Sequence, residues 1–82
     1  MRNKYSIEEL LKVLKSGAEI DFVYDNNKFS ISQANGLFIV TKHIDWENYQ
    51  SFNSAYVLVE NALVDGQKLK DIWNNVYVIM WF

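Results

Sequence analysis

The sequence predicts an α+β fold: an antiparallel sheet of about four to five strands, with an N-terminal helix and two short C-terminal helices packed mainly on one face. Three observations lead to this prediction. An amphipathic segment with helix caps comes first, alternating apolar segments joined by turn residues follow, and further helix signals precede a last apolar run. The 82 residues are predicted to form a single domain, because a chain of this length has no room for a second core.

The first predicted helix covers residues 7–16. Ser6 is placed to cap its first turn, and Glu9 can reach back to complete a capping box. Gly17 follows, where a left-handed residue ends many helices. The apolar residues recur at the spacing of one helix face, and they are Ile7, Leu10, Leu11 and Leu14.

The middle of the chain predicts strands joined by tight turns. Residues 20–24 and 29–32 alternate apolar and polar side chains, as half-buried strands do. The intervening residues 25–28 predict a hairpin turn, because Asn tolerates the positive φ that such turns require. Asn35-Gly36 predicts a second hairpin for the same reason. Residues 37–47 then predict one long strand, whose far end becomes polar and reaches solvent.

The C-terminal part predicts two short helices before the last strand. Either Asn53 or Ser54 can cap the first, which covers roughly residues 55–62. Asp65, followed by a glycine, can cap the second. The side chains expected to turn inward from these segments are Tyr56, Val59, Leu63, Leu69, Ile72 and Trp73.

The composition favours a folded globule, because 50% of the residues are hydrophobic and 16% are aromatic. Burying one Leu or Phe contributes roughly 1.5–3 kcal/mol, so a small core can offset the chain entropy with little to spare. The residues predicted to form this core are Leu10, Leu11, Leu14, Ile20, Phe22, Tyr24, Phe29, Ile31, Phe38, Val40, Leu63, Leu69, Ile72, Trp73 and Val78.

Charge and cysteine content exclude several functions. The formal net charge is −2 and the basic residues are scattered, whereas a nucleic-acid surface usually needs a basic excess, so nucleic acid is an unlikely partner. The chain has no cysteine, which removes disulfides and thiolate-bound metals, and nothing suggests a cofactor. The longest uncharged apolar run falls far short of the ~20 residues of a membrane helix, and no signal-peptide pattern is present. We therefore expect a cytoplasmic protein with no membrane partner.

One group of residues has the composition of a chemical site: His43, Asp45 and Glu47. Residues two apart on a strand share a face, so an imidazole and two carboxylates would line up for acid–base chemistry or for a divalent metal. The alternative interpretation is the solvated end of a strand. The chain offers no second histidine, no glycine-rich phosphate loop and no nucleophile on a tight turn. We therefore expect no catalytic residue, no metal site and no enzyme.

The aromatic residues of the predicted strands allow a second hypothesis. Tyr24, Phe29, Phe38 and Trp46 could form a stacking platform for single-stranded nucleic acid. Such platforms are flanked by basic residues, and only Lys28 and Lys42 are near in the sequence. Packing in the core explains the same aromatic residues without a ligand.

The last apolar run, residues 76–82, predicts a strand with two apolar faces. Either it is a central strand between helices, or it buries one face or edge against a partner. The candidate interface consists of Tyr77, Ile79, Trp81 and Phe82, and Tyr and Trp are enriched where interfaces bury their energy. The expected function is a small non-enzymatic interaction or accessory module, whose partner is another protein or a second copy of the chain.

A stretch in the C-terminal half also resembles a known group of proteins. The matching residues are Glu60-Asn61-Ala62, Asp65-Gly66 and Leu69-Lys70-Asp71-Ile72-Trp73. They resemble a family of small uncharacterised α+β proteins of Gram-positive bacteria and their phages and mobile elements. The resemblance implies an α+β domain with no assigned catalytic residue. Where those proteins tend to be acidic after the tryptophan, this chain continues with VYVIMWF.

Overall fold

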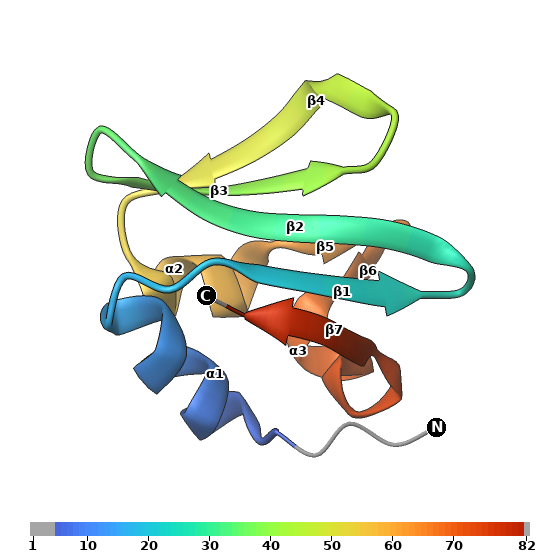
Figure 1. Cartoon of the computed structure of the whole chain (residues 1–82), viewed down its shortest axis with the longest axis horizontal. Helices are drawn as coiled ribbons and strands as arrows, with labels where there is room; N and C mark the ends of the chain where they lie inside the picture. Colours follow the sequence, from blue (N-terminus) through green and yellow to red (C-terminus); the bar gives the residue numbers. More distant parts are fainter. Residues whose placement is uncertain (1–4, 82) are drawn as a thin grey trace.

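The computed structural model describes residues 5–81, apart from the side chains of Trp46, Met80 and Trp81. It confirms the α+β prediction: five antiparallel strands form one sheet in the order β4-β3-β2-β1-β7, and the helices lie behind this sheet in Figure 1. A separate pair of short strands, β5 and β6, lies on the helix side. In chain order the elements are α1 (Ile7–Lys15), β1 (Ile20–Tyr24), β2 (Asn27–Ala34), β3 (Leu37–Lys42), β4 (Asp45–Phe52), α2 (Ala55–Asn61), β5 (Leu63–Val64), β6 (Gln67–Lys68), α3 (Leu69–Ile72), the 3₁₀ helix η1 (Trp73–Asn75) and β7 (Tyr77–Trp81).

Helix α1 begins with the predicted capping box. The Glu9 backbone N–H donates to Ser6 Oγ at 3.1 Å, and the Ser6 backbone N–H donates to Glu9 Oε1 at 3.2 Å. The helix ends at Lys15, one residue earlier than predicted, and Gly17 adopts a φ of 92° just beyond the cap. In α2, Ser54 rather than Asn53 is the N-cap, and its Oγ accepts a hydrogen bond from the Val57 N–H. Both helix starts therefore satisfy backbone donors locally.

Two predicted hairpins are confirmed. Asp25 and Asn26 adopt φ values of 51° and 65° between β1 and β2, and Asn35 and Gly36 adopt 53° and 78° between β2 and β3. Positive φ at both central residues is the signature of a type I′ turn, whose twist matches that of the flanking strands.

The prediction that Asp65 caps a helix is wrong, because Asp65 belongs to a hairpin turn of the same kind. Asp65 and Gly66 have φ values of 50° and 81° and form the hairpin turn between β5 and β6, so Asp65 does not cap a helix. The residue before α3 is Lys68, and its side chain makes no capping hydrogen bond. An Asp-Gly pair is both a cap and a hairpin signal, and here the hairpin forms.

The predicted single strand over residues 37–47 is wrong. Strand β3 ends at Lys42, His43 and Ile44 form a tight turn, and β4 returns from Asp45. Ile44 adopts a φ of 78° with 82% of its surface exposed. A β-branched residue is disfavoured in this region of φ, so nothing in the sequence signals the turn.

We expect replacement of Ile44 by glycine to stabilise the protein. The substitution removes backbone strain of about 1–3 kcal/mol. It also lowers the stability by about 0.5–1 kcal/mol, because glycine has more conformational freedom in the unfolded chain. The exposed side chain contributes little packing, so the net gain should be about 1 kcal/mol. That gain should raise Tm by about 4–8 °C in a thermal melt followed by circular dichroism.

Ile44→Val is the matched control, because valine keeps the β-branch and hence the strain. Its Tm should stay close to that of the parent chain. A glycine variant that melts no higher than the valine variant would contradict the strained turn.

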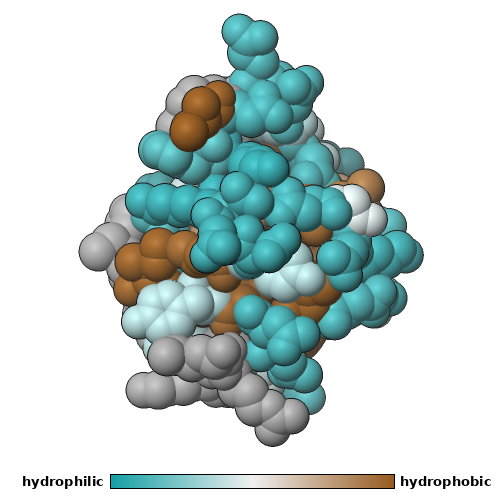
Figure 2. All heavy atoms as spheres, turned by 90° about the vertical axis from the view of Figure 1, so that its right-hand side faces the viewer, coloured by the Kyte–Doolittle hydropathy of each residue, from teal (hydrophilic) through white to brown (hydrophobic). Residues whose placement is uncertain are grey.

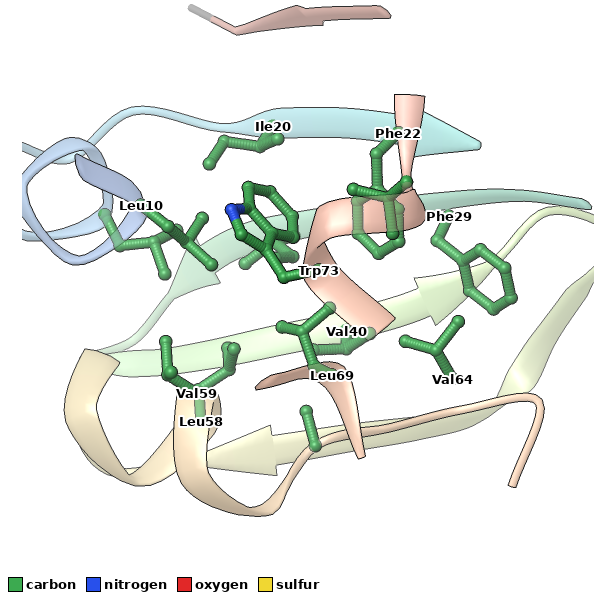
Figure 3. Close-up of a cluster of buried hydrophobic side chains, with 14 of the residues drawn as sticks. Leu10, Ile20, Phe22, Phe29, Val40, Leu58, Val59, Val64, Leu69 and Trp73 are labelled. Atoms are coloured by element: carbon green, nitrogen blue, oxygen red, sulfur yellow. The ribbon is translucent and has the colours of Figure 1, made fainter. Parts of the chain in front are cut away.

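The hydrophobic core lies between the sheet and the helices (Figure 3). Most of the predicted core is confirmed, with Leu11, Tyr24, Phe38 and Val78 partly buried at its margin. Two predictions are wrong: Leu63 is 47% exposed and Tyr56 is 62% exposed. The buried residues that the sequence did not indicate are Ala55, Leu58, Ala62, Val64 and Val76.

The face that α2 turns inward explains Tyr56 and three of the additional buried residues, Ala55, Leu58 and Ala62. From the start of α2 at Ala55, positions i, i+3, i+4 and i+7 face inward, and they are Ala55, Leu58, Val59 and Ala62. Tyr56 therefore points to solvent. Because Leu63 belongs to β5, alternation along that strand buries Val64 instead.

Trp73 lies at the centre of the core with 1% of its surface exposed (Figure 3). The Trp73 and Phe22 rings form a T-shaped pair with a centroid distance of 6.0 Å and an interplanar angle of 77°. Its Nε1–H donates to the Tyr5 backbone carbonyl at 2.7 Å. This indole therefore ties the segment before α1 to the C-terminal part of the chain.

Candidate functional site

Strand β7 is an edge strand of the sheet. It pairs with β1, where Val23 is opposite Tyr77 and Phe22 is opposite Val78, and no strand among residues 5–81 pairs with its other side. The interpretation of a central strand between helices is therefore wrong. The unpaired side carries backbone N–H and C=O groups that can bind a further strand.

The two faces of β7 differ in burial. Val78 packs against the core, whereas Tyr77 is 50% exposed and Ile79 is 45% exposed. A register shift between Phe22 and Asp21 interrupts the regular alternation after Ile79. The other two candidate interface residues are Trp81 and Phe82, and the side chain of Trp81 and all of Phe82 lie outside the described residues.

The apolar surface near this edge is visible in Figure 2. Seen from the side on which β7 begins, apolar atoms gather in the lower half of the molecule, at the level of β1 and β7, while the region above is largely hydrophilic.

The opposite edge of the sheet, β4, is protected against pairing. Because Lys42 pairs with Asp45 and Val40 pairs with Gln50, residues 46–49 lie opposite the single residue Thr41, so the strand bulges. Bulges and charged side chains are common means of blocking an edge. Strand β7 has neither charge nor proline, because residues 74–82 are uncharged and the chain contains no proline.

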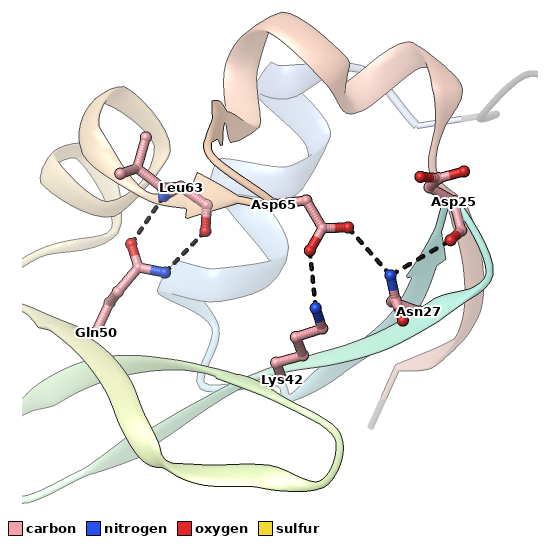
Figure 4. A network of polar contacts seen from close by, with 6 residues as sticks. All are labelled: Asp25, Asn27, Lys42, Gln50, Leu63 and Asp65. Carbon is pink, nitrogen blue, oxygen red and sulfur yellow. Dashed lines mark hydrogen bonds and ion pairs between the residues drawn. The ribbon is translucent and has the colours of Figure 1, made fainter.

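Strand β4 is also bound to β5 through the side chain of Gln50 (Figure 4). Its Nε2 donates to the Leu63 carbonyl at 2.8 Å, and its Oε1 accepts from the Leu63 N–H at 2.7 Å. The side-chain amide therefore bonds to Leu63 as a neighbouring strand would. The two edges of the sheet thus differ: β4 is bulged and bridged, whereas no strand of the described residues pairs with the outer side of β7.

The predicted alignment of His43, Asp45 and Glu47 on one strand face is wrong. His43 is in the hairpin turn, where its backbone N–H donates to the Lys28 carbonyl at 2.8 Å. Asp45 begins β4, and Glu47 is in the bulge. Among the described residues, no group of three His, Asp or Glu side chains is close enough to hold a metal ion.

The aromatic residues proposed for nucleic-acid stacking mostly belong to the core. Phe29 is 3% exposed, and Tyr24 and Phe38 pack against the buried cluster. The fourth residue, Trp46, has a side chain outside the described set. A stacking platform requires exposed ring faces, whereas Phe29 is buried and Tyr24 and Phe38 are only partly exposed.

The structure also contains a cleft that the sequence did not indicate. Its volume is about 290 Å³, and it is lined by Phe29, Val40, Lys42, Asp45, Asn48, Gln50, Leu63, Asp65 and Gly66. These residues come from separate strands that meet only in the folded chain. No motif links them in the sequence, so no local signal could have revealed the cleft.

Comparisons with protein-family models, with curated proteins and with solved structures found no match to this chain. The resemblance to proteins of Gram-positive bacteria and their phages therefore stays a prediction. Within the part of the chain that the structure describes, no helix has the length and apolar character needed to cross a membrane.

Proposed function

We propose that this protein is a small, non-enzymatic interaction module that binds a partner through β7, and that a second copy of the chain is this partner. The observation that carries the proposal is a sheet edge that pairs with no other strand of residues 5–81, is uncharged over residues 74–82 and bears the half-exposed Tyr77 and Ile79. Strand addition at such an edge provides main-chain hydrogen bonds, and apolar side chains add buried area. The absence of cysteine fits a cytoplasmic location.

Charge is the reason for choosing a second copy. Two β7 strands paired antiparallel around a two-fold axis would place uncharged residues against uncharged residues, so no like charges meet. Asp21, which is opposite Met80 in the β1–β7 pairing, is already partnered: it accepts from Ser30 Oγ at 2.7 Å and lies 3.9 Å from Lys28 Nζ. A ten-stranded sheet across two chains would result.

The experiment compares two double variants with equal added charge. Tyr77→Lys/Ile79→Lys places two ammonium groups on β7, where self-pairing would bring like charges together. Tyr56→Lys/Val57→Lys changes an aromatic and an aliphatic residue on α2, which are 62% and 40% exposed, and serves as the control. Sedimentation equilibrium measures the mass of each chain over a wide concentration range.

We expect the parent chain and the α2 variant to form dimers as concentration rises, and the β7 variant to remain monomeric with an unchanged circular dichroism spectrum. A parent chain that stays monomeric at every concentration would refute the second copy as partner. Equal dimerisation of both variants would refute β7 as the interface. Binding of a labelled single-stranded oligonucleotide at low salt, where electrostatic attraction is strongest, would instead favour the nucleic-acid alternative.

A further inference from the structure

The cleft on the helix side of the sheet has an apolar floor and polar walls. Phe29 and Val40 form the floor and are 3% and 2% exposed. The bulged β4 supplies one wall, and β5 with its turn supplies the other (Figure 4). The Gln50 amide ties these walls together through both of its bonds to Leu63. Two hydrogen bonds therefore fix the position of β5 relative to β4 beside the cleft.

A positive charge already lies against this floor. Lys42 Nζ is 5.8 Å from the centroid of the Phe29 ring and 2.9 Å from Asp65 Oδ1. The second oxygen of Asp65 accepts from Asn27 Nδ2 at 3.2 Å (Figure 4). An aromatic ring with a neighbouring carboxylate stabilises a cation. Lys42 and Asp65 neutralise each other, so they leave no net charge in the cleft.

Asp45 is the carboxylate of the cleft that lacks a cation. Its Oδ1 accepts from Asn48 Nδ2 at 3.0 Å, and no Lys, Arg or His of the described residues lies within ion-pair distance of it. The lining thus has two carboxylates and one ammonium, with a net charge of −1. A cation entering beside Asp45 would balance this charge.

We propose that the cleft binds the side chain of an arginine from a partner protein, with the guanidinium at Asp45 and the aliphatic stem over Phe29 and Val40. A volume of about 290 Å³ is at the lower limit of ligand sites, so it suits one side chain rather than a nucleotide or a larger cofactor. Guanidinium is more weakly hydrated than ammonium, so it loses less hydration free energy on entering a partly apolar cleft. Its planar fork of N–H donors can also form two hydrogen bonds to one carboxylate. This site is at the opposite edge of the sheet from β7 and does not depend on the proposed dimer.

The experiment titrates the ¹⁵N-labelled chain with two model compounds, Nα-acetyl-arginine amide and Nα-acetyl-citrulline amide. Citrulline has nearly the same shape without the charge.

We expect the arginine compound to bind with a Kd of about millimolar and to shift the backbone amide signals of Asp45, Asn48 and Gly66. Asp45→Asn should weaken this binding about tenfold, because a charge-assisted hydrogen bond is lost. Asp71→Asn, an exposed change on α3, should leave it unaltered.

Three results would overturn the proposal. The first is no shift of the amide signals of the cleft residues at high concentrations of the arginine compound, and the second is an equal shift with the citrulline compound. The third is a Kd for the arginine compound that Asp45→Asn leaves unchanged. Asp45→Asn removes a single exposed charge, so its folding can be verified from the remaining amide signals. Because no described residue of β7 lines the cleft, failure of the arginine titration would refute the arginine site and leave the dimer proposal intact.

Discussion

Replacing Trp73 with alanine should lower the free energy of unfolding by about 3–5 kcal/mol. The change removes a ring that is 1% exposed, its T-shaped contact with Phe22 and its hydrogen bond to the Tyr5 carbonyl. Removing a buried Trp costs about 3–5 kcal/mol. An 82-residue domain has a total stability of about 4–12 kcal/mol, so the change removes from about a quarter to all of it. Urea unfolding followed by far-UV circular dichroism would measure the loss.

Two further variants separate the contribution of the indole hydrogen bond from that of burying an aromatic ring. Trp73→Phe keeps most of the apolar ring but removes the N–H donor, so the Tyr5 carbonyl loses a partner and stability should fall by about 1–2 kcal/mol. Tyr56→Ala removes an aromatic ring that is 62% exposed and should change stability by no more than about 0.5 kcal/mol. If Trp73→Ala were no more costly than Tyr56→Ala, the central role of the indole would be wrong.

The parts of the fold that the sequence predicts correctly depend on neighbouring residues. The capping box of Ser6 and Glu9 and the type I′ turn at Asn35-Gly36 are each specified within a few positions. The hairpin at His43 and Ile44 has no such signal. It forms because β4 must return beside β3 to place Phe52 opposite Phe38, and this tertiary pairing outweighs the local cost of a positive φ at Ile44.

The candidate site was predictable only in part. The apolar character of Tyr77 and Ile79 is evident in the sequence, and their exposure agrees with a strand that has an uncovered face. The position of β7 at the edge follows from its pairing with β1, more than fifty residues away, which no local pattern encodes. The cleft is less predictable still, because Asp45 reaches it through a bulge and Asp65 through a hairpin.

Phe22→Ala should destabilise the chain by about 3–5 kcal/mol, comparable to the loss at Trp73. Phe22 is fully buried and lies between two other rings of the core. It stacks on Phe29 at a centroid distance of 5.4 Å and an angle of 14°, and it forms the T-shaped pair with Trp73 at 6.0 Å. Urea unfolding again measures the loss, and Val57→Ala, at a residue that is 40% exposed, is the control.

A double-mutant cycle tests whether the stacked pair contributes more than its buried area. Phe22→Leu and Phe29→Leu each keep an apolar side chain, so both variants should remain folded and measurable. Aromatic pairs add about 0.5–1.5 kcal/mol beyond area burial. The double variant should therefore lose less stability than the two single losses combined, by about that amount. Strict additivity within about 0.3 kcal/mol would mean that burial alone accounts for the pair, and that the 14° stacking angle has no energetic consequence of its own.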